Sequence, residues 1–165
     1  MATRKQQLDF LARVIPAAQA SQAKYGIPAS VTIAQAILES GWGASKLAIT
    51  CNNYFGIKAR IRDGKPIEDY ADFRTTEYFG KTPTSVVAKF RKFRSTAECF
   101  VRHAELIGTS KRYRPAMAVT NDPLAFALQL QLCGYCTDPD YASDLAGLIR
   151  QWDLTQYDNK PKEAA

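Results

Sequence analysis

The sequence predicts a mainly helical α+β fold with one small β lobe. Apolar residues recur at helical spacing before residue 52 and after residue 95, and this periodicity is lost from Asn52 to about Phe93. Within that middle stretch, Asp63-Gly64 lies between extended segments and indicates a β-hairpin. A chain of 165 residues is the size of one ordinary domain. We therefore expect one domain over residues 1–157 and a flexible polar tail over residues 158–165.

The first predicted helix is marked by apolar residues at helical spacing from Leu8 to Ala18. Pro16 should break or kink this helix, because proline removes a backbone donor and clashes with the preceding turn. Gly26 should end it.

The second predicted helix begins near Pro28 and carries Glu39 close to its end, where the turn Gly41-Trp42-Gly43 closes it. Nearly the whole circumference around Glu39 is apolar or small, which is typical of a buried helix. A carboxyl group in such a place loses water, so its pKa should rise, as a general acid requires. The alternative is that Glu39 only caps the helix or forms a structural ion pair.

The β lobe should contain extended segments over Ile67 to Phe73 and Thr75 to Phe79, followed by a turn over Gly80 to Pro83. Its last part, Lys89 to Arg94, is the most basic run in the chain and alternates with phenylalanine. This run fits either a nucleic-acid-binding face or a solvated strand beside core phenylalanines, and we favour the strand.

Three further helices are predicted after the β lobe. Ser95 to Glu98 has the form of a capping box and starts a helix over residues 96–108, which carries the single histidine, His103. Asn121 to Pro123 opens a helix that ends at Gly134, and Asp138-Pro139 opens the last one. We expect His103 to be a structural or surface residue and not a catalytic base.

The amino-acid composition favours anionic binding partners but does not distinguish one kind from another. The net charge of +6 and the pI near 9.2 favour anionic partners such as nucleic acid, acidic lipid or an anionic cell-wall polymer. The N-terminus has no apolar run of signal-peptide length, and the chain has no apolar run of the roughly 18 residues that span a membrane. We expect a soluble chain, made in the cytoplasm without a secretion signal and not inserted in a membrane.

The four cysteines leave several states open. Cys51, Cys99, Cys133 and Cys136 allow three complete disulfide pairings. A zinc site is the less favoured alternative, because there is only one close cysteine pair and one histidine. Free thiols are the expectation for a protein in the cytoplasm, and an oxidising compartment would permit a bridge.

Several motifs, spread over about residues 8–154, resemble the signature of the glucosaminidase domain, glycoside hydrolase family 73, whose members cut bacterial cell-wall glycan. The first motifs are Ala34-Gln35-Ala36, Glu39-Ser40-Gly41-Trp42-Gly43 and Asn52-Asn53-Tyr54-Phe55-Gly56-Ile57-Lys58. Further matches follow in the family's order: Thr76-Glu77-Tyr78, Val87 to Phe93, Gly134-Tyr135-Cys136-Thr137-Asp138-Pro139 and Tyr141-Ala142.

The resemblance implies a lysozyme-like fold in which a small β-hairpin lobe faces the catalytic helix across a cleft. It implies that Glu39 is the proton donor and nominates Glu77 as the second carboxylate, with Tyr135 beside the acid. Cys136 stands where the family has alanine. Glu68, Asp69 and Asp72 are competitors for the second carboxylate, and the simpler interpretation of each is a solvated hairpin residue. The implied substrate-binding residues are Trp42, Asn53, Tyr54, Phe55 and Tyr141.

The predicted function is a cofactor-free and metal-free endo-β-N-acetylglucosaminidase that acts as a monomer on peptidoglycan glycan strands. Release by a phage holin or a secretion system would bring it to the wall. The alternatives are an N-acetylmuramidase that cuts the neighbouring bond, a non-catalytic wall-binding or assembly module, and a nucleic-acid binder, which we favour least.

Overall fold

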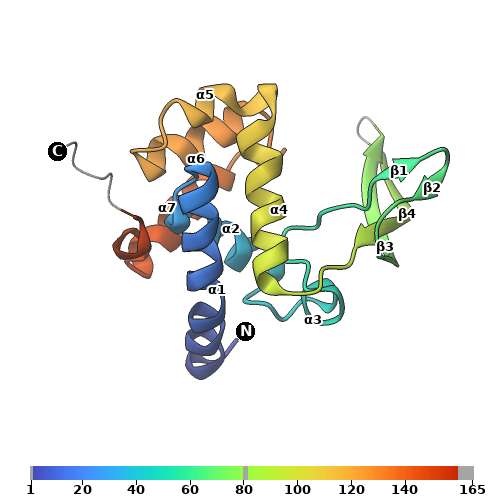
Figure 1. Cartoon of the computed structure of the whole chain (residues 1–165), viewed down its shortest axis with the longest axis horizontal. Helices are drawn as coiled ribbons and strands as arrows, with labels where there is room; N and C mark the ends of the chain where they lie inside the picture. The colour runs from blue at the N-terminus through green and yellow to red at the C-terminus, as the bar shows by residue number, and fades with distance from the viewer. Residues whose placement is uncertain (1, 80–81, 160–165) are drawn as a thin grey trace.

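A bundle of helices forms the body of the molecule, and a β lobe projects from one side of it beyond α4 (Figure 1). The computed structural model describes residues 2–79 and 82–159, apart from the side chains of residues 77–79. The helices are α1 (Arg4–Tyr25), α2 (Ala29–Ser40), α3 (Lys46–Cys51), α4 (Thr96–Thr109), α5 (Arg114–Met117), α6 (Pro123–Leu132) and α7 (Tyr141–Gln151). Two 3-10 helices, η1 (Lys111–Tyr113) and η2 (Leu154–Tyr157), complete the body. The predicted mainly helical α+β class is confirmed.

The central helix is α2, which packs against α1, α6, α7 and η2. Every residue from Ala29 to Ile37 is buried, so the helix is enclosed on all sides over most of its length. It ends at Gly41 in the left-handed conformation, as predicted, and Trp42 and Gly43 also have positive φ. Only its last turn, including Glu39, reaches the surface.

The N-terminal helix is longer than predicted, and Pro16 does not end it. Thr3 and Gln6 form a reciprocal capping box at its start, and Gly26 ends it in the left-handed conformation, as predicted. Residues on both sides of Pro16 are buried, among them Val14 and Ala17, because α1 packs against α4 and α2. Burial of a large apolar side chain contributes about 1.5–3 kcal/mol, so a few such residues offset the roughly 3 kcal/mol cost of an interior proline.

The β lobe consists of two separate antiparallel hairpins. The first, β1 (Ile61–Arg62) with β2 (Lys65–Pro66), turns at Asp63 and Gly64, both with positive φ, as predicted. The second pairs β3 (Tyr70–Phe79) with β4 (Thr82–Arg91) from Tyr70↔Arg91 to Phe79↔Thr82. Of the predicted turn over Gly80 to Pro83, residues 80 and 81 lie outside the described residues.

The helices after the β lobe begin close to their predicted starts. Ser95 accepts a hydrogen bond from the backbone N–H of Glu98, but the Glu98 carboxylate binds the N–H of Arg94, so the capping box is not reciprocal. Asp122 accepts from two backbone N–H groups at the start of α6. The last helix, α7, begins two residues after Pro139. The short helices α3, α5, η1 and η2 have too few residues to give a periodic signal.

The first two residues of the expected tail, Asp158 and Asn159, form hydrogen bonds to the helical body. Asp158 accepts hydrogen bonds of 2.7 Å from both the backbone N–H and the hydroxyl of Ser30, at the start of α2. The backbone N–H of Asn159 donates to Gln22 at 2.9 Å. The chain after η2 is therefore bound to the N-terminal end of the central helix. Residues 160–165 of the predicted tail lie outside the described part of the chain.

Candidate active site

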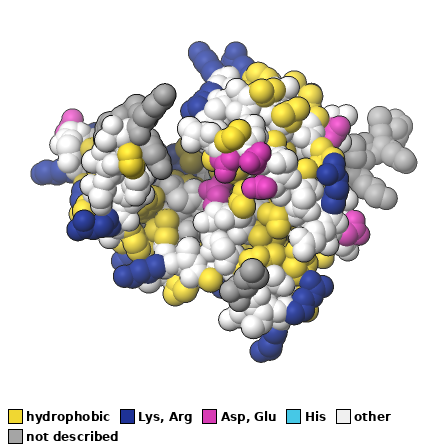
Figure 2. Space-filling model, turned by 180° about the vertical axis from the view of Figure 1, so that it is seen from behind, with side chains coloured by type: hydrophobic (Ala, Val, Ile, Leu, Met, Phe, Trp, Pro, Cys, Tyr) yellow, Lys and Arg dark blue, Asp and Glu magenta, His cyan; other side chains and the backbone are white. Residues whose placement is uncertain are grey.

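The face on which the β lobe meets the helical body is hollowed between the two, and acidic side chains gather beside the hollow (Figure 2). Glu39 stands at the C-terminal end of α2 and is solvent-exposed, although most of that helix is buried. The strongly buried segment before it fixes where this carboxylate emerges.

Two helices hold the Glu39 carboxylate. The Tyr141 hydroxyl, at the start of α7, donates to Glu39 Oε1 at 2.9 Å. The same hydroxyl accepts from Gln35 Nε2 at 3.0 Å. Gln35 lies one turn before Glu39 on α2 and is fully buried, so α2 supplies both the acid and the amide that orients its partner.

The environment of the Glu39 carboxyl group raises its pKa to about 7. Desolvation is the main cause, because protein atoms surround the carboxyl group even though the side chain as a whole remains accessible. Hydrogen bonds from Tyr141 and then Tyr135 favour the charged form and offset part of this rise. At pH 6 a group with this pKa is about 90% protonated, compared with about 3% for an ordinary glutamate. A raised pKa is what a general acid requires, and the catalytic role of Glu39 stays a prediction here.

Tyr135 links Glu39 to a buried histidine. Its hydroxyl lies 3.0 Å from His103 Nε2, and its ring stacks on that of Tyr141 with centroids 5.6 Å apart. The His103 ring in turn stacks on Phe55 at 3.8 Å. Burial lowers the pKa of His103 to about 3, so the ring is neutral.

The hydrogen bonds assign the proton of His103. Nδ1 is buried without a partner, and an orphaned donor is rarer in proteins than an orphaned acceptor. The tautomer with the proton on Nε2 leaves Nδ1 as a bare acceptor and donates to Tyr135. The Tyr135 hydroxyl then has its own proton available for Glu39. Burial, followed by the charge of Glu39, raises the pKa of Tyr135, so this hydroxyl acts as a donor.

Trp42 follows Glu39 in the turn after α2 and packs among other aromatic rings. Its ring packs at 4.7 Å from Trp152 and edge-on to Phe10 at 5.8 Å. Gly43 allows the Phe10 ring to pack against this turn, because a Cβ at residue 43 would lie 2.9 Å from a Phe10 ring carbon. The φ of Gly43 is +74°, a conformation that also favours glycine. Trp42 is half-buried, so one part of its ring remains exposed and its predicted contact with substrate remains a proposal.

Asn53, Tyr54 and Phe55 lie inside the protein, with exposures of 1%, 2% and 6%. Asn53 Nδ2 donates to the backbone carbonyls of Ile57 and Arg91, and the Tyr54 hydroxyl contacts Thr96 at 3.2 Å. Asn53 and Tyr54 thus make their polar contacts within the protein, whereas Phe55 borders a cavity that Tyr135 also lines, and contact of these side chains with a sugar stays a prediction. We assign them to holding the segment between the body and the β lobe.

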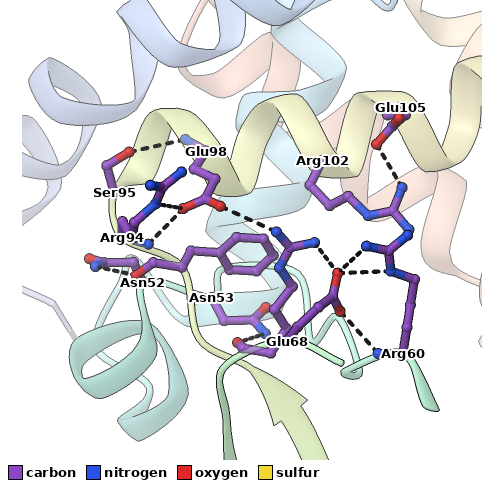
Figure 3. A network of polar contacts seen from close by, with 11 residues as sticks. Asn52, Asn53, Arg60, Glu68, Arg94, Ser95, Glu98, Arg102 and Glu105 are labelled. Carbon is purple, nitrogen blue, oxygen red and sulfur yellow. Dashed lines mark hydrogen bonds and ion pairs between the residues drawn. The ribbon is translucent and has the colours of Figure 1, made fainter. Parts of the chain in front are cut away.

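The candidate second carboxylates differ in their surroundings. Glu77 lies on β3 with its backbone opposite Thr84, and its side chain is outside the described residues. Glu68 is not the solvated residue expected, since it binds Arg91 at 2.6 Å and Arg60 at 2.8 Å (Figure 3). Burial raises the pKa of Glu68, but the bonds and charges of these arginines outweigh it and lower the pKa. A carboxylate held in this way is structural. Asp72 is solvated and pairs with Lys89 at 3.0 Å.

The described residues contain no cluster of three or more histidine, cysteine, aspartate or glutamate side chains that could hold a metal ion. All four cysteines are free. Burial raises the pKa of Cys99 to about 12, which leaves this thiol unreactive. No helix among the described residues has the length and apolar character needed to cross a bilayer.

Sequence reasoning missed the supporting roles of His103 and Gln35. His103 lies three residues after Phe100 and four before Ile107, on the apolar stripe of α4, so its burial was readable from the spacing. Gln35 stands one turn before the acid on an otherwise apolar helix. Its partner, Tyr141, is 106 residues away, a contact that no local pattern contains.

Comparison with known proteins identifies the family. Residues 15–154 match the Glucosaminidase family, described as mannosyl-glycoprotein endo-beta-N-acetylglucosaminidase. The chain belongs to the glucosaminidase family of glycoside hydrolases. It is 38% identical to exo-glucosaminidase LytG of Bacillus subtilis over 93% of this chain, and 35% identical to peptidoglycan hydrolase FlgJ of Pseudomonas aeruginosa over 90%. The chain spans 54% of the length of LytG and 37% of that of FlgJ.

Solved structures of glucosaminidase-family relatives have the same fold. The catalytic domain of the autolysin Auto from Listeria monocytogenes superposes with a TM-score of 0.80 at 33% identity, covering 96% of this chain and 90% of that one. A C-terminally truncated glycoside hydrolase domain of FlgJ from Salmonella typhimurium gives a TM-score of 0.72 at 33% identity, covering 89% and 97%. The lysozyme-like fold predicted from the resemblance is confirmed.

Proposed function

We propose that this chain is a peptidoglycan hydrolase that cleaves, within glycan strands, the β-1,4 bond between N-acetylglucosamine and N-acetylmuramic acid. Membership of the glucosaminidase family supports glycoside hydrolysis. The names of FlgJ, a peptidoglycan hydrolase, and of the autolysin Auto support the cell wall as substrate. The observation that carries the proposal is Glu39, a carboxylic acid with a pKa of about 7 held by two tyrosine hydroxyls.

Glu39 acts as the general acid. Hydrolysis of a glycosidic bond requires a proton on the departing oxygen as positive charge develops on the sugar ring. Because about half of the Glu39 carboxyl groups are protonated at pH 7, the donor form is well populated at neutral pH. Tyr141 and Tyr135 then stabilise the carboxylate left behind, since both donate to its charged form.

Glu77 is the proposed second carboxylate. It lies on β3 in the β lobe, whereas Glu39 lies on α2 in the helical body, so the two acids come from different lobes and the proposed substrate path runs between these lobes. In this position a carboxylate stabilises the oxocarbenium-like sugar or activates water. The acetamido group of the substrate can share the second role.

The proposed substrate is a peptidoglycan glycan strand. The protein acts on it as a monomer, on the outer side of the cytoplasmic membrane. The net charge of +6 attracts the chain to an anionic wall polymer. Acid-assisted hydrolysis by two carboxylates needs no metal or other cofactor.

Glu39→Gln tests the proposal, because glutamine keeps the shape and cannot donate the proton. Purified peptidoglycan is digested, the products are reduced with borohydride, and the new reducing ends are identified by mass spectrometry. The wild type should give reduced N-acetylglucosamine ends, and Glu39→Gln should lower the rate by about 10²–10⁴-fold. Asp144→Asn, an exposed carboxylate on α7, serves as the matched control and should retain activity.

Three outcomes would contradict parts of the proposal. Reduced muramic acid as the sole new end would make the chain a muramidase. Near wild-type activity in a folded Glu39→Gln variant, with folding checked by circular dichroism, would show that Glu39 is not the acid. A folded wild type that releases no reducing ends would leave a wall-binding role. For Glu77→Gln we expect a loss above tenfold, and a smaller loss would remove Glu77 from the reaction.

A further inference from the structure

A cavity of about 530 Å³ lies beside the proposed reaction centre, between the segment leading into the β lobe and the helices α4 and η1. Its volume falls within the range of roughly 300–1,000 Å³ that is typical of ligand sites. Tyr135 and His103 form part of its lining. The catalytic roles assigned above use these two residues but leave the remainder of the cavity without a function.

The lining of this cavity is cationic. Lys58, Arg60, Arg102 and Arg112 all line it, and none of its lining residues is aspartate or glutamate. Arg112 donates from Nε to the Cys133 carbonyl at 2.6 Å and from Nη2 to the Gly134 carbonyl. These acceptors are neutral, so the hydrogen bonds fix the guanidinium without cancelling its charge.

The neighbouring carboxylates neutralise the other arginines only in part. In the network of Figure 3 three carboxylates pair with four arginines: Glu68, Glu98 and Glu105 with Arg60, Arg91, Arg94 and Arg102. The Glu68 carboxylate forms ion pairs with both Arg60 and Arg91 through the same oxygen, Oε1. With Arg112 added, positive charge exceeds negative charge around the cavity.

Arg60 and Arg102 approach the cavity from opposite sides. Arg60 precedes β1, Arg102 is on α4, and the two side chains point toward one another (Figure 3). Their carboxylate partners, Glu68 and Glu105, do not line the cavity. Two guanidinium groups facing each other repel, and an anion between them relieves that repulsion. A carboxylate is the planar anion that guanidinium groups bind best.

We propose that this cavity binds a carboxylate carried by the glycan substrate next to the bond that is cut. This inference rests on the proposed function, because Tyr135 lines the cavity and also binds Glu39. On this proposal, a sugar placed at Glu39 brings its neighbour's substituents to the arginines. In peptidoglycan two groups have this chemistry: the carboxylate of the lactyl ether on muramic acid, free where the peptide is absent, and the carboxylates of the attached peptide.

The test compares the wild type with Arg60→Gln/Arg102→Gln on three substrates. These are intact glycan with its peptides, glycan whose peptides have been removed so that the lactyl carboxylate is free, and the same glycan with this carboxylate blocked as a methyl amide. On carboxylate-bearing substrate the double variant should raise KM by about tenfold with kcat nearly unchanged, since it loses binding that is equal in ground state and transition state. On the blocked glycan it should match the wild type.

The matched control is Arg62→Gln, which also removes a cation from the first hairpin but does not line the cavity. It should leave KM unchanged. Glu105→Gln provides a change of opposite sign, because it removes the carboxylate that competes for Arg102, and it should lower KM on carboxylate-bearing glycan. This second variant keeps the test valid if the double variant is unstable.

The pattern across substrates identifies the ligand. A KM effect on peptide-bearing glycan alone assigns the peptide carboxylates, and an effect on the peptide-free glycan alone assigns the lactyl group. An unchanged KM on every substrate, or an equal loss on the blocked glycan, would overturn the inference. Failure of the proposed function is separate, because the wild type would then release no new N-acetylglucosamine reducing ends from any of the three glycans.

Discussion

Replacing Tyr141 with phenylalanine tests how the protein sets the acidity of Glu39. The hydroxyl donates to Glu39 at 2.9 Å and favours the charged carboxylate, so it holds the pKa below the value that burial alone would give. Removing it should therefore raise the pKa of Glu39. The alkaline limb of the pH–rate profile, where the acid loses its proton, should move to higher pH.

The size of this shift follows from the contact. A hydrogen bond to a charged group contributes about 1.5–3 kcal/mol, and water replaces part of it because the Glu39 side chain is accessible. If about half is lost, the shift is about one pH unit. At pH 8 the protonated fraction would then rise from about 10% to about 50%. The height of the profile should fall, because the acid is held less firmly, but the position of the limb does not depend on the height.

The assay is the initial rate of reducing-end release from purified peptidoglycan between about pH 4 and pH 9. The control is Tyr157→Phe, on η2, which packs near the start of α2 and away from Glu39. Its limb should coincide with that of the wild type near pH 7. A limb in Tyr141→Phe that stays in place or moves to lower pH would refute the assignment of the limb to Glu39 or of Tyr141 as its donor.

Three further predictions concern stability and the supporting shell. The folded-state pKa of Glu39 lies above its unfolded value of 4.5, so the contribution of Glu39 to stability is full below pH 4.5 and is lost as pH rises through about 7. The Glu39→Gln variant should therefore be more thermally stable than the wild type between pH 5 and pH 8, as measured by calorimetry. Asp158→Ala removes two bonds to Ser30 and should lower the midpoint by about 2–4 °C, from a loss of about 1 kcal/mol, whereas Asp158→Asn should lose less. His103→Phe keeps a ring against Phe55 but removes the donor to Tyr135, so kcat should fall about 3- to 10-fold and the alkaline limb should move upward; an unchanged profile would make His103 purely structural.

Local patterns were sufficient where short-range geometry decides the outcome. The end of α2 at Gly41 and the turn at Asp63-Gly64 both require positive φ, and both were readable from residue type. Pro16 is the exception among the local signals. Its cost is local, but the burial that offsets it comes from α2 and α4, which the sequence of α1 does not contain.

The sequence determined by itself that Glu39 would lie near the end of a buried helix, just before a glycine-rich turn, and its motifs pointed to the glucosaminidase family. Only the tertiary structure decided which residues surround the acid. Tyr141 and Tyr135 reach it from the far end of the chain, and His103 is placed behind Tyr135 by the packing of α4. Burial of Asn53, Tyr54 and Phe55, which as a sequence motif resembled a binding surface, was likewise decided by packing. The reason is physical: helix ends and turns depend on backbone torsions of neighbouring residues, whereas desolvation and hydrogen bonding of a side chain depend on all elements that pack around it.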